Sequence, residues 1–357
     1  MTADSDQHPA IGPPPHTGAN MRSLFALLLM PAFALALDYD QPKPTKADEP
    51  VAKKWSAAKA GEYLDGVGVN WTRDRQCITC HTNMPHVMAG PALPAKNVGW
   101  KEVRTFLEDD VKSWSKGGKP RGDTYVVATA AALAFTDART TGKLHEQTKA
   151  ALDRMWTVQK KTGEWGWLKC DWPPLEHDDY YGAVLAAVAV GIAPEKYAEG
   201  PSAKAGLAKL KAYLQNTPAP DVHHLAMLLW ANSLLKDLLT DDEAKASIAA
   251  LQTLQRADGG WSLPSLGDYK RRDKDKTPND KNAASDGYGT GFTVFVLRQA
   301  GVKADDKSVA AGVKWLKENQ RESGRWYTRS LNNDKAHYIT NAGTAFCVLA
   351  LDACGEK

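Results

Sequence analysis

A cysteine pair followed by a histidine is the strongest chemical signal in the sequence. Residues 75–86 read RQCITCHTNMPH, so Cys77 and Cys80 are separated by two residues and His81 follows directly. Two thiols on one turn of chain can bond to the two vinyl groups of one haem, and the next imidazole can reach the iron. The segment therefore predicts one covalent haem c, with Cys77 and Cys80 as thioether donors and His81 as proximal iron ligand.

Other chemistries of paired cysteines fit this chain less well. A tetrahedral zinc site needs a second pair of ligands, and the sequence has no second CxxC. A thioredoxin-like redox pair belongs in a βαβ context, which the helical pattern described below does not provide. CxxCH resembles instead the haem-attachment motif of c-type cytochromes. Zinc binding and a disulfide remain as alternatives.

The second axial ligand of such a haem is left open by the sequence. Three nearby side chains follow the motif too closely to reach the opposite face without a sharp reversal of the chain: Met84, His86 and Met88. Better candidates lie where other apolar helices begin, namely His177, His223, His224 and His337. A second protein ligand would favour electron transfer, whereas an open iron would favour small-molecule binding or peroxidase-like activity.

Three segments share one spacing, in which glycine follows a glutamine by four residues and tryptophan follows it by six. They contain Gln159, Gly163 and Trp165, then Gln255, Gly259 and Trp261, then Gln320, Gly324 and Trp326. Each ends an amphipathic helical pattern and precedes a helix rich in Ala, Gly, Val and Leu. The glutamine can cap a helix end, the glycine can form the turn and the tryptophan can pack over the joint.

With weaker copies included, the chain contains six helix pairs from about residue 51 to residue 357. The second helices are expected to start near residues 77–86, 123, 178, 221, 286 and 337. The first helix of each pair is amphipathic, and the second is apolar almost all round, as in a helix buried on every side. Closing six such pairs into a ring would bury every apolar face. The sequence predicts an all-α (α/α)6 toroid over residues 53–357 with the apolar helices inside.

Such a ring would gather the starts of the inner helices on one rim. The candidate histidines would then lie beside acidic and phenolic side chains at the same helix starts: Asp178, Asp179, Tyr180, Asp286 and Tyr288. A charged insertion at residues 262–285 is expected to be a solvated loop.

The glutamine–glycine–tryptophan repeats and the helix pairs resemble the squalene cyclase and prenyltransferase-β superfamily of α/α toroids. The resemblance covers roughly residues 51–357. Protein prenyltransferases in it bind zinc through an Asp-x-Cys and a histidine. The matching positions here are Asp286, Tyr288 and a displaced His337, so tyrosine replaces the cysteine ligand. This departure puts zinc-dependent prenyl transfer in doubt.

Squalene-type cyclases protonate their substrate with the middle acid of a DxDD motif. The corresponding residues 176–179 read EHDD, which makes Asp178 the implied proton donor, with Asp179 and Asp286 as further candidate catalytic acids. Glutamate replaces the first aspartate, and the second helical domain usual in such cyclases is missing. The resemblance therefore leaves open whether the chain is an enzyme, and an isoprenoid cyclase or a non-catalytic ligand-binding toroid stand as alternatives to the haem protein.

The composition and the N-terminal residues limit which partners and which cellular location are expected. The chain has 357 residues, of which 43% are hydrophobic and 24% charged, and its net charge is +3. This balance, without a basic stripe interleaved with aromatic residues, predicts no nucleic-acid partner. The expected partner is a redox protein or a small molecule, and the sequence does not set an oligomeric state.

An apolar run at residues 21–38, MRSLFALLLMPAFALALD, resembles a secretory signal that is cut near Leu37. It is short for a membrane span and contains a central proline. We therefore expect residues 1–20 to be a non-structural extension or the product of a mis-called start, with Met21 as the true first residue. Residues 21–36 are expected to be a signal peptide and residues 37–52 a linker. An exported, periplasmic protein with no stable membrane span after cleavage is predicted.

Overall fold

The computed structural model describes residues 37–170, 172–272 and 278–356. The expected extension and signal peptide at residues 1–36 lie outside the described residues. The chain divides into Met1–Asp38 and a compact unit, Tyr39–Lys357, which holds all the helices described below. Within the described residues, no helix combines the length and the apolar character that crossing a membrane requires.

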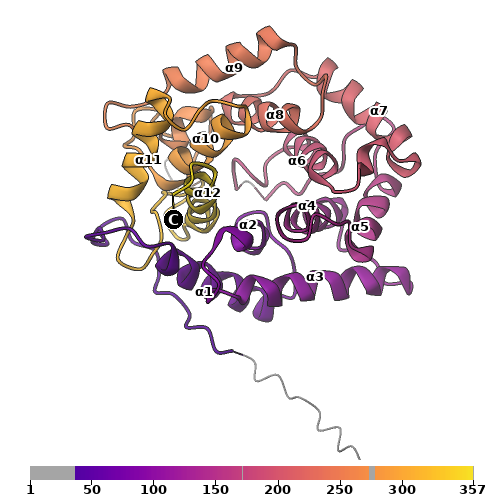
Figure 1. The fold of residues 1–357 in the computed structure, drawn as a ribbon, viewed down its shortest axis with the longest axis horizontal. Coiled ribbons are helices and arrows are strands. Elements are labelled where there is room, and N and C mark those ends of the chain that lie inside the picture. The colour runs from indigo at the N-terminus through magenta and orange to yellow at the C-terminus, as the bar shows by residue number, and fades with distance from the viewer. Residues whose placement is uncertain (1–36, 171, 273–277, 357) are drawn as a thin grey trace, which may run out of the picture. The chain divides into compact units, whose positions relative to one another are not determined.

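The compact unit contains two concentric sets of helices (Figure 1). The outer set comprises α1 (Ala57–Arg75), α3 (Gly99–Ser115), α5 (Glu146–Thr157), α7 (Pro201–Asn216), α9 (Asp241–Thr253) and α11 (Lys307–Asn319). The inner set comprises α2 (Asn83–Ala89), α4 (Asp123–Thr140), α6 (Asp179–Ile192), α8 (Val222–Leu234), α10 (Gly287–Gln299) and α12 (Ile339–Ala353). Three short 3-10 helices, Gly90–Ala92, Tyr197–Glu199 and Leu263–Leu266, lie in the connections.

The inner helices form a closed ring. Each inner helix packs against the next one along the chain, and α12 packs against both α1 and α2 (Figure 1). The inner helices α4, α6, α8 and α10 are buried along most of their length, as their apolar sequences require. The predicted (α/α)6 toroid is confirmed, and the observed inner-helix starts lie close to the expected positions.

The three repeated motifs are joints between successive outer helices. The Gln320 amide donates to the carbonyls of Gly324 at 2.8 Å and Ser56 at 3.0 Å. The indole of Trp326 donates to the Leu316 carbonyl at 2.8 Å. Equivalent contacts recur at the other two motifs, from Gln159 and Trp165 and from Gln255 and Trp261. Because Ser56 is the N-cap of α1, the third joint connects the last outer helix, α11, to the first, α1.

The segment expected to be a linker packs along this closing joint. The Glu49 carboxylate pairs with the buried Arg325 guanidinium at 2.6 Å. The backbone N–H of Ala52 donates to the Gln320 carbonyl at 2.8 Å. Residues 39–52 therefore belong to the compact unit, because a buried arginine in the last joint needs a carboxylate partner that this segment supplies.

Replacing Gly324 by alanine is expected to weaken ring closure. Gly324 has φ +94°, and a Cβ there would overlap the Lys59 carbonyl of α1. Gly117 has nearly the same φ, +95°, with nothing within 4 Å of a Cβ, so Gly117→Ala measures the backbone cost alone, about 1–3 kcal/mol. Chemical denaturation should show a further loss of about 1–3 kcal/mol for Gly324→Ala. Equal losses would mean that the contact with α1 adds no constraint.

The expectation of a solvated loop at residues 262–285 is wrong for its first part. Leu263, Leu266 and Tyr269 are buried, and the Leu263 N–H donates to the Asp286 carboxylate at 2.6 Å. The guanidinium of Arg271 donates to the Ser330 carbonyl at 2.9 Å. The charge density of the insertion hid these apolar anchors, which fold it back onto the ring.

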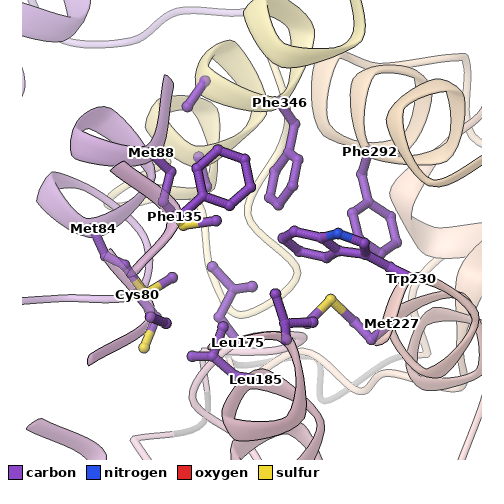
Figure 2. Close-up of a cluster of buried hydrophobic side chains, with 14 of the residues drawn as sticks. Cys80, Met84, Met88, Phe135, Leu175, Leu185, Met227, Trp230, Phe292 and Phe346 are labelled. Carbon is purple, nitrogen blue, oxygen red and sulfur yellow. The ribbon is translucent and has the colours of Figure 1, made fainter. Parts of the chain in front are cut away.

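Aromatic side chains from alternate inner helices meet inside the ring (Figure 2). Trp230 of α8 lies edge-on to Phe135 of α4, with ring centroids 6.1 Å apart, and to Phe346 of α12 at 6.4 Å. Phe292 of α10 also packs edge-on to Phe346, at 5.2 Å. Because α4, α8 and α12 are not adjacent in the ring, these aromatic side chains reach across its interior and fill it where they meet.

Candidate functional site

The CxxCH segment forms the turn between α1 and α2. Helix α1 ends at Arg75, and its C-cap residue Gln76 adopts a left-handed conformation with φ 48°. The Asn83 amide donates to the Cys77 carbonyl at 2.8 Å, and its oxygen accepts the Thr79 N–H at 2.7 Å. Asn83 also donates to the Thr72 hydroxyl of α1 at 3.0 Å. A single asparagine thus fixes the turn that presents Cys77 and Cys80.

A cavity of about 460 Å³ opens beside this turn. Cys77, Cys80 and His81 all line it. The rest of its wall is mainly aromatic and apolar with a few charged groups, and includes Trp71, Tyr125, Trp167, Leu168, Arg121 and Glu176. This volume falls within the roughly 300–1,000 Å³ of typical small-molecule and cofactor sites.

The His81 imidazole is buried and oriented by a chain of hydrogen bonds. Its Nδ1 lies 2.7 Å from the Thr82 hydroxyl, which accepts the Asn341 amide at 3.0 Å. The Asn341 oxygen in turn accepts the Tyr63 hydroxyl at 2.6 Å. Since Nδ1 is engaged, Nε2 is the ring nitrogen available to a metal. Burial lowers the pKa of His81 to about 3, so the imidazole is neutral, as a metal ligand must be.

Two aromatic rings contact His81. Tyr338 stacks on its face, with centroids 5.0 Å apart and planes 12° from parallel, and Trp71 meets it edge-on at 5.0 Å. A metal binds imidazole in the ring plane along the nitrogen lone pair, so a stacked tyrosine leaves that direction free. The donor set of two cysteines and one neutral, oriented histidine on one cavity wall fits a covalently attached haem.

Glu176 is a buried carboxyl group on the same wall, 5% exposed. The Cys80 backbone N–H donates to it, and burial raises the pKa of Glu176 to about 7. Burial and the nearby Glu176 raise the pKa of the Cys80 thiol, which keeps that sulfur protonated. In the sequence, Glu176 is visible only as a substituted member of the acidic motif.

A second polar cluster lies at the starts of α6, α8 and α10. His224 lies between two carboxylates, with Nε2 2.9 Å from Asp178 and Nδ1 2.7 Å from Asp221. Both aspartates are N-caps: Asp178 accepts the Tyr181 N–H and Asp221 accepts the His224 N–H. Asp221 is a member of this cluster that the sequence reasoning missed, although its position before an apolar helix is a helix-start signal.

The cluster holds a buried charge. Burial alone would lower the pKa of His224, but the two carboxylates raise it to about 9. The pKa of Asp178 is lowered, because the contact with His224 outweighs burial. The same competition lowers the pKa of Asp221 to about 2. His224 is therefore an imidazolium and both aspartates are ionised near neutral pH.

None of the four histidines proposed as candidates for the second axial ligand lines the cavity beside Cys77. His177 is exposed and lies edge-on to Tyr269 at 6.3 Å, while His223 is buried with Nε2 2.9 Å from the Tyr288 hydroxyl. His224 is held by its two aspartates, and Nδ1 of His337 accepts the Ser330 N–H at 3.0 Å. These contacts hold all four candidate histidines away from the cavity wall.

The three residues closest to the motif are also engaged elsewhere. The buried His86 ring is bound to Asp65, with Nε2 2.8 Å from the Asp65 carboxylate. Met84 and Met88 point into the apolar cluster inside the ring (Figure 2). Of the described residues, His81 is the histidine on the cavity wall, and no methionine lines it.

The remaining candidate acids have structural contacts. Asp179 pairs with Lys160 at 2.8 Å and with Lys169 at 3.2 Å. Asp286 is the N-cap of α10, accepts backbone N–H groups and the Thr328 hydroxyl, and burial raises its pKa to about 6. His337 is bound to the Ser330 backbone rather than to Asp286. The prenyltransferase-type ligand positions do not converge.

The fold and part of the sequence are similar to known proteins. A family model described as the squalene-hopene cyclase C-terminal domain matches residues 222–338, about a third of the chain. No curated protein matches. A glycosidase variant in complex with glucose is similar over 84% of this chain and 97% of its own, with 11% identity and a TM-score of 0.49.

Two terpene enzymes are also similar in structure. An ent-copalyl diphosphate synthase from Streptomyces platensis is similar over 76% of this chain and 50% of its own, with 13% identity and a TM-score of 0.49. The type II terpene cyclase MstE from Scytonema is similar over 82% and 97%, with 13% identity and a TM-score of 0.46. The family match supports the resemblance to the squalene cyclase toroids. It includes His224 and Asp286 but excludes Asp178 and the CxxCH turn.

Proposed function

We propose that this protein binds one haem c covalently, through Cys77 and Cys80, with His81 as the proximal iron ligand. The observation that carries the proposal is the cavity of about 460 Å³, whose wall contains all three residues. The CxxCH motif alone would rest on a sequence pattern without any space for a cofactor. Its position on a cavity with a mainly apolar and partly aromatic wall adds space for a planar cofactor.

The side chains around the cavity have distinct tasks in this proposal. Thr82 orients the His81 ring, and the turn held by Asn83 presents both sulfurs. The aromatic wall, with Trp71 and Trp167, limits access of water to the cofactor. Arg121 supplies a positive charge for the anionic propionates. The haem would supply a one-electron redox couple and an iron able to bind a ligand.

The proposal places the protein in redox chemistry or ligand binding outside the cytoplasm. Covalent haem attachment takes place after export, so residues 21–36 would act as a cleaved signal peptide. The partner would be a redox protein or a small molecule that reaches the cavity. The role of the toroid in this proposal is to position the turn.

The test is covalent haem content after export in a host that matures c-type cytochromes. Wild-type protein should retain haem in denaturing electrophoresis and give a c-type pyridine haemochrome spectrum. Cys77→Ala/Cys80→Ala should lose all covalent haem, because no thiol remains to form a thioether. The matched control Cys170→Ala/Cys354→Ala removes two half-buried thiols outside the cavity and should keep full haem content. Folded, exported wild-type protein without haem would disprove the proposal.

A squalene-cyclase-like isoprenoid cyclase is the second candidate. It is favoured by the family match and by the ion pair between Asp178 and His224, which makes Asp178 a strong acid whenever it is protonated. In the resting cluster, however, Asp178 is an ionised helix cap. A cyclase also needs an interior large enough for its substrate.

A further inference from the structure

Three metal-binding side chains converge at the start of α8, outside the cavity beside the CxxCH turn. Asp221, His223 and His224 each offer one carboxylate oxygen or ring nitrogen, and these three atoms lie within 4.8 Å of one another. Both imidazoles are fully buried, and the Asp221 side chain is 14% exposed. Two imidazoles and one carboxylate form a donor set that suits zinc and similar divalent transition metals.

His223 carries a ring nitrogen without a partner. Its Nδ1 is buried and has no hydrogen-bond partner among the described residues. The plane of the ring is fixed by stacking on Phe292, with centroids 4.6 Å apart, and on Tyr181 at 6.2 Å. A buried nitrogen that is left unpaired costs free energy, and a bound water or metal ion is the usual explanation for one in a native protein.

The opposite nitrogens of both rings lie beside oxygen atoms. Nε2 of His223 is 2.9 Å from the Tyr288 hydroxyl, and Nε2 of His224 is 2.9 Å from the Asp178 carboxylate. A histidine that binds a metal through one nitrogen commonly donates its other N–H to an oxygen, which fixes the tautomer and the ring orientation. These contacts leave Nδ1 of each ring for the metal, and Nδ1 of His224 already lies 2.7 Å from Asp221.

We infer that Asp221, His223 and His224 bind one divalent transition-metal ion of the zinc class. The metal takes a carboxylate oxygen of Asp221 and Nδ1 of each imidazole, while Asp178 and Tyr288 act as positioning residues for the two rings. Binding releases the Nδ1 proton of His224 to solvent, so the ion replaces the positive charge that His224 supplies in the metal-free protein.

The site goes beyond the proposed haem attachment and does not depend on it. Asp178 precedes α6, the three ligands lie at the start of α8, and Tyr288 belongs to α10. A bound ion would therefore fasten the starts of three inner helices to one another. Three protein ligands also leave one position of a tetrahedral ion for a water molecule or another oxygen ligand.

Zinc alone is the probe, titrated by calorimetry into the untagged, chelator-treated full chain. Cys77→Ala/Cys80→Ala is the background, because it removes the thiols of the CxxCH turn that could bind zinc themselves. It should bind one zinc per chain, and X-ray absorption should show only nitrogen and oxygen ligands, at about 2.0–2.1 Å. His223→Leu in this background should abolish the binding.

A milder pair of variants keeps the test decisive if His223→Leu fails to fold. Tyr288→Phe removes only the hydroxyl beside His223 and should weaken zinc binding by about 10- to 100-fold. Tyr180→Phe is the matched control. It removes a buried hydroxyl that has no hydrogen-bond partner among the described residues, from a ring that lies edge-on to His224, and should leave the zinc affinity unchanged.

Three results would overturn this inference. One is a folded Cys77→Ala/Cys80→Ala chain that binds no zinc, and another is zinc bound through sulfur. The third is zinc affinity that neither His223→Leu nor Tyr288→Phe changes, which would place the ion elsewhere. Covalent haem is not needed for any of these measurements, so a protein without haem would disprove the proposed function and leave this test unaffected.

Discussion

Replacing His224 by leucine is expected to lower the free energy of unfolding by about 3–5 kcal/mol. His224 is fully buried, and its ring neutralises the carboxylates of Asp178 and Asp221. Without it, two ionised caps at the starts of α6 and α8 face each other with no counter-charge. Leucine fills most of the volume, so the loss is electrostatic rather than a packing defect.

The contribution of His224 to the free energy of unfolding should depend on pH, and the pKa of His224 sets the direction of that dependence. The pKa of His224 is raised from 6.5 to about 9 in the folded protein. Its stabilising contribution is therefore complete below about pH 6.5 and is lost as the pH rises toward 9. Between pH 6.5 and 8.5 the wild type should lose about 2 kcal/mol from this group. His224→Leu should not show this alkaline decline.

The acid side of the profile is not diagnostic. Burial lowers the pKa of both His81 and His223 to about 3, so stability falls as the pH drops below 6.5 for reasons unrelated to His224. Urea denaturation at pH 6.5, 7.5 and 8.5 isolates the alkaline part. His177→Leu, at an exposed position beside the same cluster, is the matched control and should keep the wild-type profile. A parallel decline in His224→Leu would show that other groups produce it.

The ring could be predicted from the sequence because its signals are local and repeated. The spacing of Gln320, Gly324 and Trp326 occurs three times, and each copy performs the same hydrogen bonding at an outer joint. The apolar second helices identify themselves by composition, since a helix buried on every side has no polar face. Ring closure was predicted from the number of helix pairs, because six such pairs can close and bury every apolar face.

The candidate site could be predicted only as far as its residues are adjacent in the chain. Cys77, Cys80 and His81 form a contiguous motif, so their joint position on one wall follows from the spacing. The side chains that complete the wall come from other repeats, as Glu176 and Tyr125 do. The helical periodicity of the sequence does not predict which residues at the helix starts point toward the cavity and which cap their own helix.

The histidines show the same difficulty. Their shared position at helix starts predicted a common rim, and the structure does bring His223 to the start of α10 and His224 to the start of α6. Their hydrogen-bond partners decided their orientation. Tyr288 of α10 holds His223, and Asp178 at the start of α6 holds His224, and both contacts join residues on different helices. Sequence spacing alone could not separate a helix cap from an iron ligand.

Replacing Trp230 by alanine is expected to lower the free energy of unfolding by about 3–5 kcal/mol and to leave a cavity inside the ring. The indole is 1% exposed and lies edge-on to Phe135, Phe295 and Phe346. Since its neighbours come from three other inner helices, they cannot all close over the gap. Trp114→Ala, which removes a half-buried tryptophan at the end of α3, is the matched control and should cost less.

Stabilisation by added ligands separates the two candidate functions, with Trp230→Ala as the positive control for an open interior. Indole should raise the Tm of Trp230→Ala by refilling the gap and should leave the wild type unchanged, because a ligand stabilises only the state that binds it. A soluble isoprenoid alcohol such as farnesol should likewise leave the wild-type Tm unchanged if aromatic side chains fill the interior. Saturable stabilisation of the wild type by the isoprenoid would instead show an interior able to open for a cyclase substrate. That result would make Asp178 and His224 the residues to pursue, ahead of the CxxCH turn.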